Sequence, residues 1–274
     1  MAWRITEDVE EFLAGAGDFL RARPVEHTLL LTIADTVRLR GPHTYGAGTP
    51  VFGWCDDGVF VRTPPRGAVL SGMPADAATA LAGSLADTDL PSVGGPEPAT
   101  EAFAAEWHRL TGATPRVADR QRLYRLAELT PAEPPPPGAG RVAGPADRDL
   151  LVDWMTTFQR DLGDQPHRTA EGIDDTLSYG GLLLWEDAGR PVSMAGVTRP
   201  LDGMVRVTAV YTPREHRARG YGGAATAAVT RAALDAGATD VVLFTDRSNP
   251  TSNALYQRLG YTPIEDRRTV EFAA

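Results

Sequence analysis

The sequence predicts an α/β protein of the α+β kind, with a mixed, mostly antiparallel sheet flanked by helices and two tandem copies of one fold. Three observations support this. The 274 residues suffice for two domains of roughly 130 residues, each able to bury a core at 42 % hydrophobic content. Strand-forming runs alternate with helical patterns. Four consecutive prolines, Pro134–Pro137, interrupt both patterns near the middle of the chain.

That proline-rich stretch marks the clearest boundary. Consecutive prolines favour polyproline II, which neither continues a helix nor donates hydrogen bonds to a sheet. We predict a domain at 1–130, a semi-rigid linker at 131–140 and a second domain at 141–274.

The second domain has the clearer pattern. Leu151, Trp154 and Phe158 recur at helical spacing, and β-rich runs alternate with glycine-containing turns. Gly237 and Gly260 stand where glycine ends a helix. The expected elements, in order, are helices at 146–162 and 169–177, strands at 181–185, 192–198 and 204–212, a helix at 224–236, a strand at 241–245, a helix at 251–259 and a strand at 261–272.

The first domain is less regular, and the stretch between its last two helices predicts no strand. The order from its central strand onward approximates that of the second domain, which favours a divergent internal duplication. The expected elements are helices at 7–22, 75–86 and 100–110 and strands at 28–33, 51–54, 58–63 and 121–126.

The composition of the chain limits which partners it can bind and in which cell compartment we expect it. A formal net charge of −9 disfavours nucleic acid and favours a cationic small molecule. The chain has no lysine, which excludes a P-loop. The single cysteine, Cys55, cannot form an internal disulfide, no run reaches about 18 apolar residues, and the acidic N-terminus lacks a signal-peptide core. We expect a cytoplasmic protein with no membrane partner.

One segment of the second domain carries the chemistry. The strand at 204–212 leads into the turn Arg217-Ala-Arg-Gly-Tyr-Gly-Gly223, which opens a helix. The first amides of a helix lack internal partners and lie at the positive end of its dipole, and glycines keep side chains away from them. Such a turn binds phosphate or pyrophosphate. Arg217 and Arg219 add positive charge, so we predict an anion site.

A dinucleotide site is the weaker alternative. Gly220 to Ala225 matches the loose pattern G-x-G-x-x-A, and Asp246 follows where a ribose-binding acid is expected. However, 213–219 separate the glycines from their strand, and only 28 residues follow Asp246, too few for a doubly wound sheet. A nicotinamide enzyme therefore stays as the residual hypothesis.

Two motifs in sequence point to a known family. Arg217-Ala-Arg-Gly-Tyr-Gly222 resembles the R/Q-x-x-G-x-G/A signature of the GNAT superfamily of N-acetyltransferases. Downstream, Asn249 precedes the tyrosine of Leu255-Tyr256 by seven residues and a Gly260-Tyr261 step follows, which resembles the second hallmark of that superfamily. The resemblance covers roughly 141–272.

The resemblance implies acetyl-CoA as donor and direct transfer of the acetyl group to an amine. The pantetheine arm would pair with the end of a splayed central strand, here Val210, Tyr211 and Thr212. The pyrophosphate would lie on amides of Arg217, Ala218, Arg219, Gly220, Tyr221, Gly222 and Gly223. Asn249 would face the pantetheine; Asn253 either does so or is solvated on its helix.

Tyr256 matches the general acid of the family. A phenol with a pKa near 10 is protonated at neutral pH and can donate to the departing thiolate; the alternative role is an aromatic wall. No general base is visible, because the strand at 204–212 has no glutamate. His216 lies in the phosphate loop, where it is either solvated or faces the phosphate. Glu186, Asp174 and Asp175 either line the acceptor cleft or are solvated, and a water chain to bulk solvent is the other route for the proton.

The other candidates are weaker. His27, His43, His108 and His167 are isolated and lack the spacing of metal ligands, so we expect no metal.

The first domain resembles a copy that has lost its site. Its stretch Pro64–Pro74 lacks the signature, and Trp107-His108 stands where the second domain has Leu255-Tyr256. We expect it to cover the active half, to enclose the acceptor cleft or to mediate a homodimer.

The sequence thus predicts an acetyltransferase acting on a primary amine of a small acceptor, with a cationic one favoured. The alternatives are a non-catalytic acyl-CoA sensor or scaffold, and a transferase that uses a longer acyl-CoA.

Overall fold

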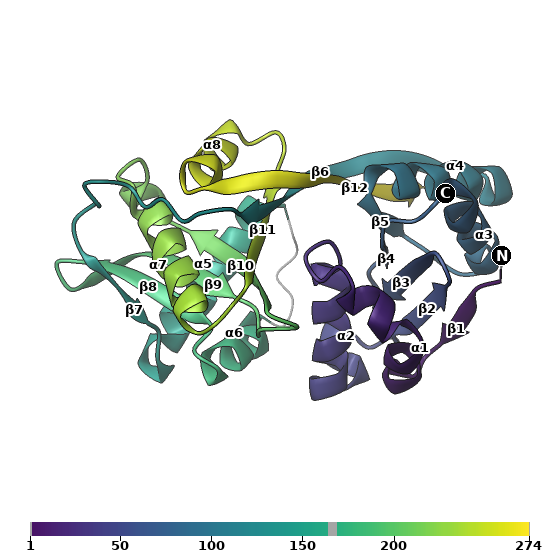
Figure 1. The fold of residues 1–274 in the computed structure, drawn as a ribbon, viewed down its shortest axis with the longest axis horizontal. Helices are drawn as coiled ribbons and strands as arrows, with labels where there is room; N and C mark the ends of the chain where they lie inside the picture. Colours follow the sequence, from purple (N-terminus) through teal and green to yellow (C-terminus); the bar gives the residue numbers. More distant parts are fainter. Residues whose placement is uncertain (1, 164–168, 274) are drawn as a thin grey trace. The chain divides into compact units, whose positions relative to one another are not determined.

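The structure is a computed structural model that describes residues 2–163 and 169–273. The chain folds into two compact units (Figure 1). Unit 1 comprises Met1–Leu123, Thr245–Ser248 and Ile264–Ala274, and unit 2 comprises Tyr124–Phe244 and Asn249–Pro263. The C-terminal segment therefore belongs to the unit built mainly from the N-terminal half. The predicted domain boundaries and linker stay a prediction.

The same order of elements, β-α-α-β-β-β-α-β-α-β, occurs twice along the chain. The first series is β1 (Arg4–Thr6), α1 (Val9–Arg21), α2 (Thr28–Arg40), β2 (Val51–Cys55), β3 (Gly58–Arg62), β4 (Ala68–Leu70), α3 (Ala75–Leu85), β5 (Ser92–Pro96), α4 (Glu97–Thr111) and β6 (Thr114–Leu126). The second is β7 (Ala139–Val142), α5 (Arg148–Asp161), α6 (Thr169–Ser178), β8 (Leu182–Asp187), β9 (Arg190–Val197), β10 (Met204–Tyr211), α7 (Tyr221–Asp235), β11 (Asp240–Asp246), α8 (Pro250–Arg258) and β12 (Tyr261–Ala273). Short 3₁₀ turns lie at Pro42–Tyr45, Pro145–Asp147 and Arg214–His216.

Strand pairing repeats as well. The successive pairs from β1 to β4 are antiparallel and β4 pairs with β5 in parallel; the pairs from β7 to β10 are likewise antiparallel and β10 pairs with β11 in parallel. The last part of β12 is antiparallel to β5 and completes unit 1. The predicted mixed, mostly antiparallel sheet flanked by helices is confirmed, and the repeated order and pairing give the chain two copies of this fold.

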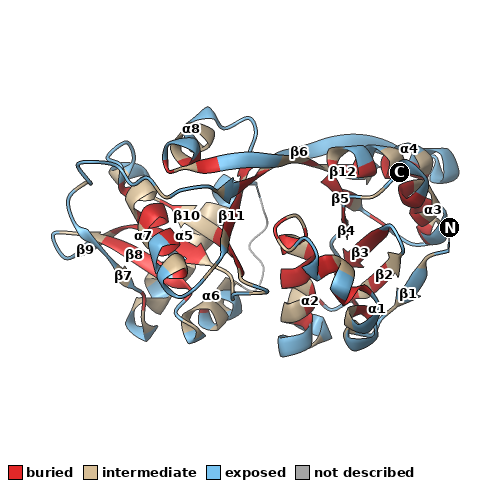
Figure 2. Ribbon diagram, viewed as in Figure 1, coloured by how far each residue is buried: buried red, intermediate tan, exposed pale blue. Residues whose placement is uncertain are grey.

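The alternation of buried side chains along the strands of unit 2 shows which helices cover which face of the sheet. Leu183 and Trp185 pack in the core that contains α7 and α8, whereas Leu182 and Leu184 pack with Leu151 of α5 and Ile173 of α6. Successive side chains of a strand point to opposite faces. The two core layers therefore lie on the two sides of one sheet, and Figure 2 shows these strands mostly buried and the outer faces of the helices exposed.

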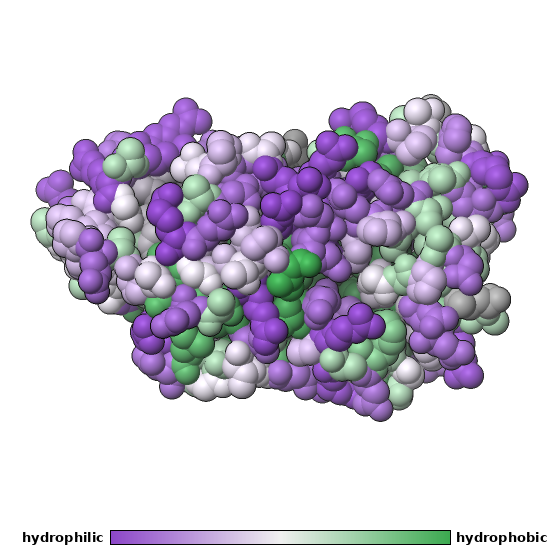
Figure 3. All heavy atoms as spheres, turned by 45° about the horizontal axis from the view of Figure 1, so that its top comes forward, coloured by the Kyte–Doolittle hydropathy of each residue, from purple (hydrophilic) through white to green (hydrophobic). Residues whose placement is uncertain are grey.

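Unit 1 has a core of its own. Phe60, Leu70 and Val93 from the strands pack with Leu81 of α3 and Phe103 of α4. All five side chains are fully buried. On the face that Figure 3 shows, hydrophilic residues predominate and hydrophobic residues form small separate groups.

One predicted strand is wrong. The run at 28–33 (TLLLTI) lies in helix α2. Leu30, Leu31, Ala34 and Val37 are buried at helical spacing along it. A short apolar run has the composition of a buried strand, and only the continuation of the pattern to Val37 indicates a helix.

Four strands have no counterpart in the sequence predictions. β1 and β4 have three residues each, β5 is Ser-Val-Gly-Gly-Pro, and β7 begins at Ala139 inside the predicted linker. Glycine and proline are depleted in strands, and three residues are too few for a pattern. β5 lies between α3 and α4, where no strand was predicted, and it completes the match between the two halves.

No helix among the described residues has the length and apolar character that a membrane crossing requires.

Candidate functional site

A bulge in β10 changes the face that its side chains occupy. Val205 and Val207 pack on the α7 side of the sheet. The register against β9 then shifts between Thr208 and Tyr211, and Ala209 has a φ of 50°. Beyond the shift, Tyr211 packs on the α5 side. An inserted residue reverses the alternation of a strand, so the bulge turns the end of β10 relative to its start.

The bulge coincides with the end of the parallel pairing to β11. That pairing covers Met204–Asp240 to Val207–Leu243. β10 continues to Tyr211, and no further pair with β11 occurs in the part of the chain that the structure describes. Its last backbone N–H and C=O groups on that side are open to a ligand. Val210 and Tyr211, predicted to face the pantetheine arm, lie in this segment and Thr212 follows it.

The end of β10 is held from its other neighbour. Ser193 of β9 is fully buried. Its hydroxyl donates to the carbonyl of Tyr211 at 3.0 Å and shares a hydrogen bond with the hydroxyl of Thr212 at 2.9 Å. No local sequence pattern distinguishes Ser193 from other strand serines, so its sequence context does not indicate this role.

Helix α7 opens with free amides. Gly220 is its N-cap in the left-handed region, with a φ of 85°, which glycine adopts without strain. The first helical hydrogen bond runs from the Ala224 amide to the Gly220 carbonyl at 3.0 Å. The amides of Tyr221, Gly222 and Gly223 precede it and have no partner among the described residues. They lie at the positive end of the helix dipole.

These amides lie next to the end of β10. A Cβ on Gly222 would stand 3.2 Å from Thr212 Oγ1 and 4.0 Å from Val210 Cγ1. A Cβ on Gly223 would stand 2.9 Å from Leu255 Cδ1 of α8. The structure therefore brings together the two segments predicted for the pyrophosphate and the pantetheine, and glycine is what allows this close approach.

Arg217 is held within the protein. Its Nε donates to the Thr212 carbonyl at 2.9 Å and its guanidinium pairs with Asp161, the last residue of α5, at 3.0 Å. Arg214 contacts the same carboxylate at 3.3 Å. The hydrogen bond from Arg217, more than any other contact, lowers the pKa of Asp161. Arg217, predicted to add positive charge at the phosphate site, therefore ties the loop to α5 through Asp161, a contact that no sequence pattern indicates.

The rest of the loop is more exposed. Ala218 has a φ of 61°, and Arg219 lies beside the Tyr221 hydroxyl. That hydroxyl donates to Asp187 Oδ2 at 2.5 Å, which raises the pKa of Tyr221. His216 is half-buried, and its Nδ1 is buried without a hydrogen-bond partner in the described part of the chain.

Both predicted asparagines have structural contacts. Asn249 is the N-cap of α8, and its side chain accepts from the Ser252 amide at 3.0 Å. Asn253 donates to the Asn249 carbonyl at 2.7 Å and accepts from the buried Tyr124 hydroxyl at 2.8 Å. Asn253 is therefore half-buried and hydrogen-bonded rather than solvated on its helix.

Tyr256 lies on the buried side of α8. Its ring is 8 % exposed and meets the ring of Tyr261 edge-on, with the centroids 6.2 Å apart. Its hydroxyl has no hydrogen-bond partner among the described residues. Burial raises the pKa of Tyr256 to about 12, so the phenol holds its proton throughout the physiological range.

The candidate bases are engaged in ion pairs. Glu186 pairs with Arg141 at 2.8 Å. Asp174 pairs with Arg148 at 2.6 Å, which lowers the pKa of Asp174, and Asp175 pairs with Arg199 at 3.0 Å. A carboxylate that accepts from an arginine is a weaker proton acceptor than a free one.

The corresponding strands of unit 1 stay together. β4 pairs with β5 through Ala68 and Val69. A Cβ on Gly95 of β5 would stand 3.0 Å from the carbonyl oxygen of Leu70, the last residue of β4. Arg267, only 6 % exposed, donates to this carbonyl at 3.3 Å. The backbone that is open at the end of β10 is therefore covered at the end of β4.

The helix that follows β4 also differs from α7. Asp76 lies in the first turn of α3, and its carboxylate accepts from the Ala77 amide at 3.0 Å. The first turn of α7 holds no acidic residue. A carboxylate at a helix N-terminus takes the place of an anionic ligand and repels it.

The structure gives the surroundings of two of the histidines that the sequence predicts to be isolated. His27 is buried with Nδ1 3.0 Å from the Leu20 carbonyl, and His108 Nδ1 is 2.9 Å from the Ala113 carbonyl. His167 lies outside the described residues. Over 2–163 and 169–273, no group of three or more histidine, cysteine or acidic side chains is arranged to hold a metal.

The buried tyrosines predict a loss of stability at alkaline pH. The pKa of Tyr256 is raised to about 12, and burial also raises that of Tyr261. Because the pKa of such a tyrosine is higher in the folded state, the folded protein has its full stability below the unfolded value near 10. Part of this stability is lost as the pH rises towards 12, since the unfolded state gives up the proton first. With its pKa raised from 10 to about 12, Tyr256 alone accounts for about 3 kcal/mol of this loss in full and for roughly half of it between pH 9 and 11. Urea unfolding at pH 9 to 11 measures it. Tyr256→Phe should fall less steeply than wild type, and equal slopes would contradict the assigned burial.

Part of the second half of the chain matches a known protein family. Residues 148–261 match the family model of the acetyltransferase (GNAT) family. This range contains β10, the glycine-rich turn, α7 and α8. No curated protein sequence matches the chain.

Solved structures share the fold at low identity. A GCN5-related N-acetyltransferase from Kribbella flavida is 23 % identical with a TM-score of 0.58, over 80 % of this chain and 89 % of that one. A GNAT-family acetyltransferase from Colwellia psychrerythraea is 12 % identical with a TM-score of 0.61, over 99 % of both chains. A tandem GNAT protein from the clavulanic acid biosynthesis pathway is 13 % identical with a TM-score of 0.59, over 99 % of this chain and 98 % of that one.

Proposed function

We propose that this protein moves an acetyl group from acetyl-CoA to a primary amine of a small acceptor, because residues 148–261 match the acetyltransferase (GNAT) family, which transfers acyl groups from acyl-CoA. The observation that carries this proposal is the juxtaposition in unit 2 of an open strand end, β10 beyond Val207, with the free amides that open α7. An acyl-CoA presents a pantetheine arm and a pyrophosphate that need these two kinds of partner.

The residues of unit 2 fit the coenzyme. Val210 and Tyr211 offer backbone groups to the pantetheine amides, and the amides of Tyr221, Gly222 and Gly223 offer hydrogen bonds to the pyrophosphate. When bound, the coenzyme supplies the acyl thioester. We propose one donor site per chain, because unit 1 has a covered strand end and an acidic first turn in α3.

Three demands of acyl transfer fall on the protein. The thioester oxygen must be polarised, the departing thiolate must gain a proton, and the amine must be neutral. A backbone N–H near Val210 suits the first role. The Tyr256 hydroxyl, with its raised pKa, suits the second because it stays protonated. The amine proton leaves to solvent, since Glu186, Asp174 and Asp175 are held by arginines.

A thiol-release assay with a panel of amines tests the proposed reaction. We expect free CoA to appear with a small primary amine, and the rate to rise with pH until the amine itself is deprotonated. The acidic net charge of −9 favours cationic acceptors such as diamines. Binding of acetyl-CoA without thiol release for any amine would favour an acyl-CoA sensor instead.

Asp161 is expected to position the phosphate-binding loop. Asp161→Asn weakens the contacts to Arg217 and Arg214, so the loop is ordered less well before ligand binds. We expect the Kd for acetyl-CoA to rise about 3-fold to 5-fold, on the scale of an exposed ion pair. Calorimetric titration measures this rise.

Asp149→Asn is the matched control. Asp149 lies on the same helix, is almost fully exposed, and contacts Arg148 at 3.7 Å. Its replacement should leave the affinity unchanged. Equal affinities of wild type and Asp161→Asn would show that the contacts of Asp161 with Arg217 and Arg214 have no role in acetyl-CoA binding.

A further inference from the structure

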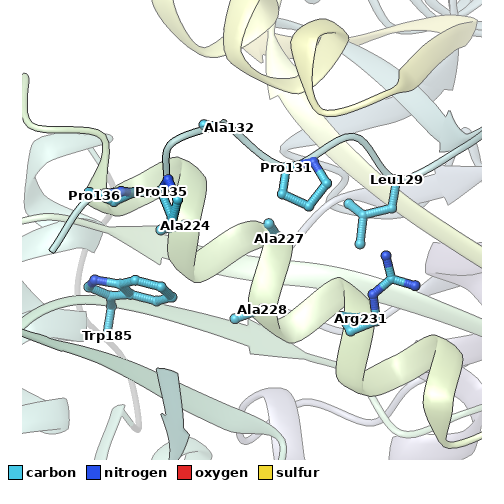
Figure 4. A pocket seen from close by; sticks show the side chains of 10 residues that line it. All are labelled: Leu129, Pro131, Ala132, Pro135, Pro136, Trp185, Ala224, Ala227, Ala228 and Arg231. Atoms are coloured by element: carbon cyan, nitrogen blue, oxygen red, sulfur yellow. The ribbon is translucent and has the colours of Figure 1, made fainter. Parts of the chain in front are cut away.

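A small pocket in unit 2 runs along α7 from Ala224, in the first turn of the helix, to Arg231. It has a volume of about 220 Å³. Residues 129–136, which lead from β6 towards β7, form one wall, and α7 forms the other (Figure 4). The lining residues are Leu129, Pro131, Ala132, Pro135, Pro136, Trp185, Ala224, Ala227, Ala228 and Arg231.

The wall of the pocket is almost wholly apolar. Ala224, Ala227 and Ala228 recur on one face of α7, and their short side chains leave the space open rather than filling it. The indole N–H of Trp185 is already satisfied, because it donates to the Pro137 carbonyl at 2.9 Å. A ligand body here would therefore be apolar, since it meets few groups that can hydrogen-bond.

One cation stands at the end of the pocket opposite Trp185. Figure 4 shows the Arg231 side chain beside Leu129, with Trp185 at the other end and the alanines of α7 between them. Arg231 is exposed and has no ion-pair partner among the described residues. A guanidinium beside an apolar wall selects a ligand that carries a carboxylate at one end.

We propose that this pocket binds an amphipathic monocarboxylate, with its apolar body along Trp185 and the alanines and its carboxylate on Arg231. The small volume suits one aromatic ring or a medium-length alkyl chain. Arg231 follows Gly222 by nine residues on α7, about 13 Å along the axis, which separates this carboxylate from the proposed pyrophosphate position. The pocket is therefore a second ligand site, beyond the proposed transfer reaction.

Calorimetric titration of the full chain with octanoate tests the proposal, with n-octylamine as a probe of equal chain length and opposite charge. We expect octanoate to bind at one site per chain and octylamine to bind more weakly. Arg231→Gln should raise the Kd for octanoate about 5-fold, the scale of a solvent-exposed ion pair. Ala132 lies on the exposed wall of the pocket, so Ala132→Asp should weaken the binding of octanoate by placing a second negative charge beside it.

Two controls make the result decisive. Arg190→Gln removes an exposed arginine of β9 that does not line the pocket and should leave the octanoate affinity unchanged. Octanoate should also bind in the presence of saturating acetyl-CoA, so the proposed donor site can fail or succeed independently. No octanoate binding at millimolar concentration, equal binding of octylamine, equal binding by Arg231→Gln, or displacement by acetyl-CoA would each overturn the proposal.

Discussion

Gly222→Glu is expected to weaken acetyl-CoA binding by about 100-fold or more, measured by calorimetric titration. Gly222 lies in the first turn of α7, where its amide is free and a Cβ would stand 3.2 Å from Thr212 Oγ1. A glutamate here places its carboxylate among the amides proposed for the pyrophosphate. It satisfies those amides itself and repels a second anion, as Asp76 does at the start of α3.

Gly83→Glu is the matched control for this substitution. Gly83 lies inside α3, and a Cβ there meets nothing within 4 Å. The same change of charge should leave acetyl-CoA affinity unchanged and the helix slightly more stable, because glycine is a poor helix former. If Gly222→Glu binds acetyl-CoA as wild type does while remaining folded, the pyrophosphate does not lie on these amides.

Tyr256→Phe is expected to lower kcat by about 100-fold while changing the Kd for acetyl-CoA less than 3-fold, on the scale of general acid catalysis. The substitution removes only the hydroxyl proposed to protonate the thiolate. That hydroxyl has no hydrogen-bond partner among the described residues, so its loss should cost little stability. Thiol release with an amine identified in the panel gives kcat, and urea unfolding gives the free energy of unfolding.

Tyr261→Phe should show the opposite effect. The Tyr261 hydroxyl is buried and lies 2.7 Å from the Thr230 hydroxyl. Its removal leaves Thr230 without this partner and should lower the free energy of unfolding by about 1 kcal/mol. The kcat should stay at the wild-type value. If Tyr256→Phe turns over as fast as wild type, Tyr256 has the aromatic-wall role. If neither protein turns over, the result supports an acyl-CoA sensor.

Sequence alone was most informative where a pattern is local and long. The helix around Leu151, Trp154 and Phe158 repeats its apolar spacing over several turns, and α5 lies where this spacing predicts it. By contrast, TLLLTI of α2 was misassigned to a strand because six apolar-rich residues do not define a period. β5, with two glycines and a proline among five residues, forms because its neighbours in unit 1 pair with it.

The candidate site divides in the same way. The glycines from Gly220 to Gly223 are recognisable because a strand-to-helix turn needs them at fixed positions. Asp161 and Ser193 were not found, because their partners Arg217 and Tyr211 lie 56 and 18 residues away and no sequence pattern joins them. Folding brings them together, and they hold the segments that the motif supplies.

The stoichiometry of acetyl-CoA binding to the full chain tests the central claim most directly. Unit 2 has an open end of β10 beside the free amides of α7, whereas Arg267 and Asp76 cover the corresponding positions of unit 1. Calorimetric titration should therefore give one acetyl-CoA per chain. Two sites per chain would contradict the assignment of unit 1, and no binding at all would contradict the donor site itself.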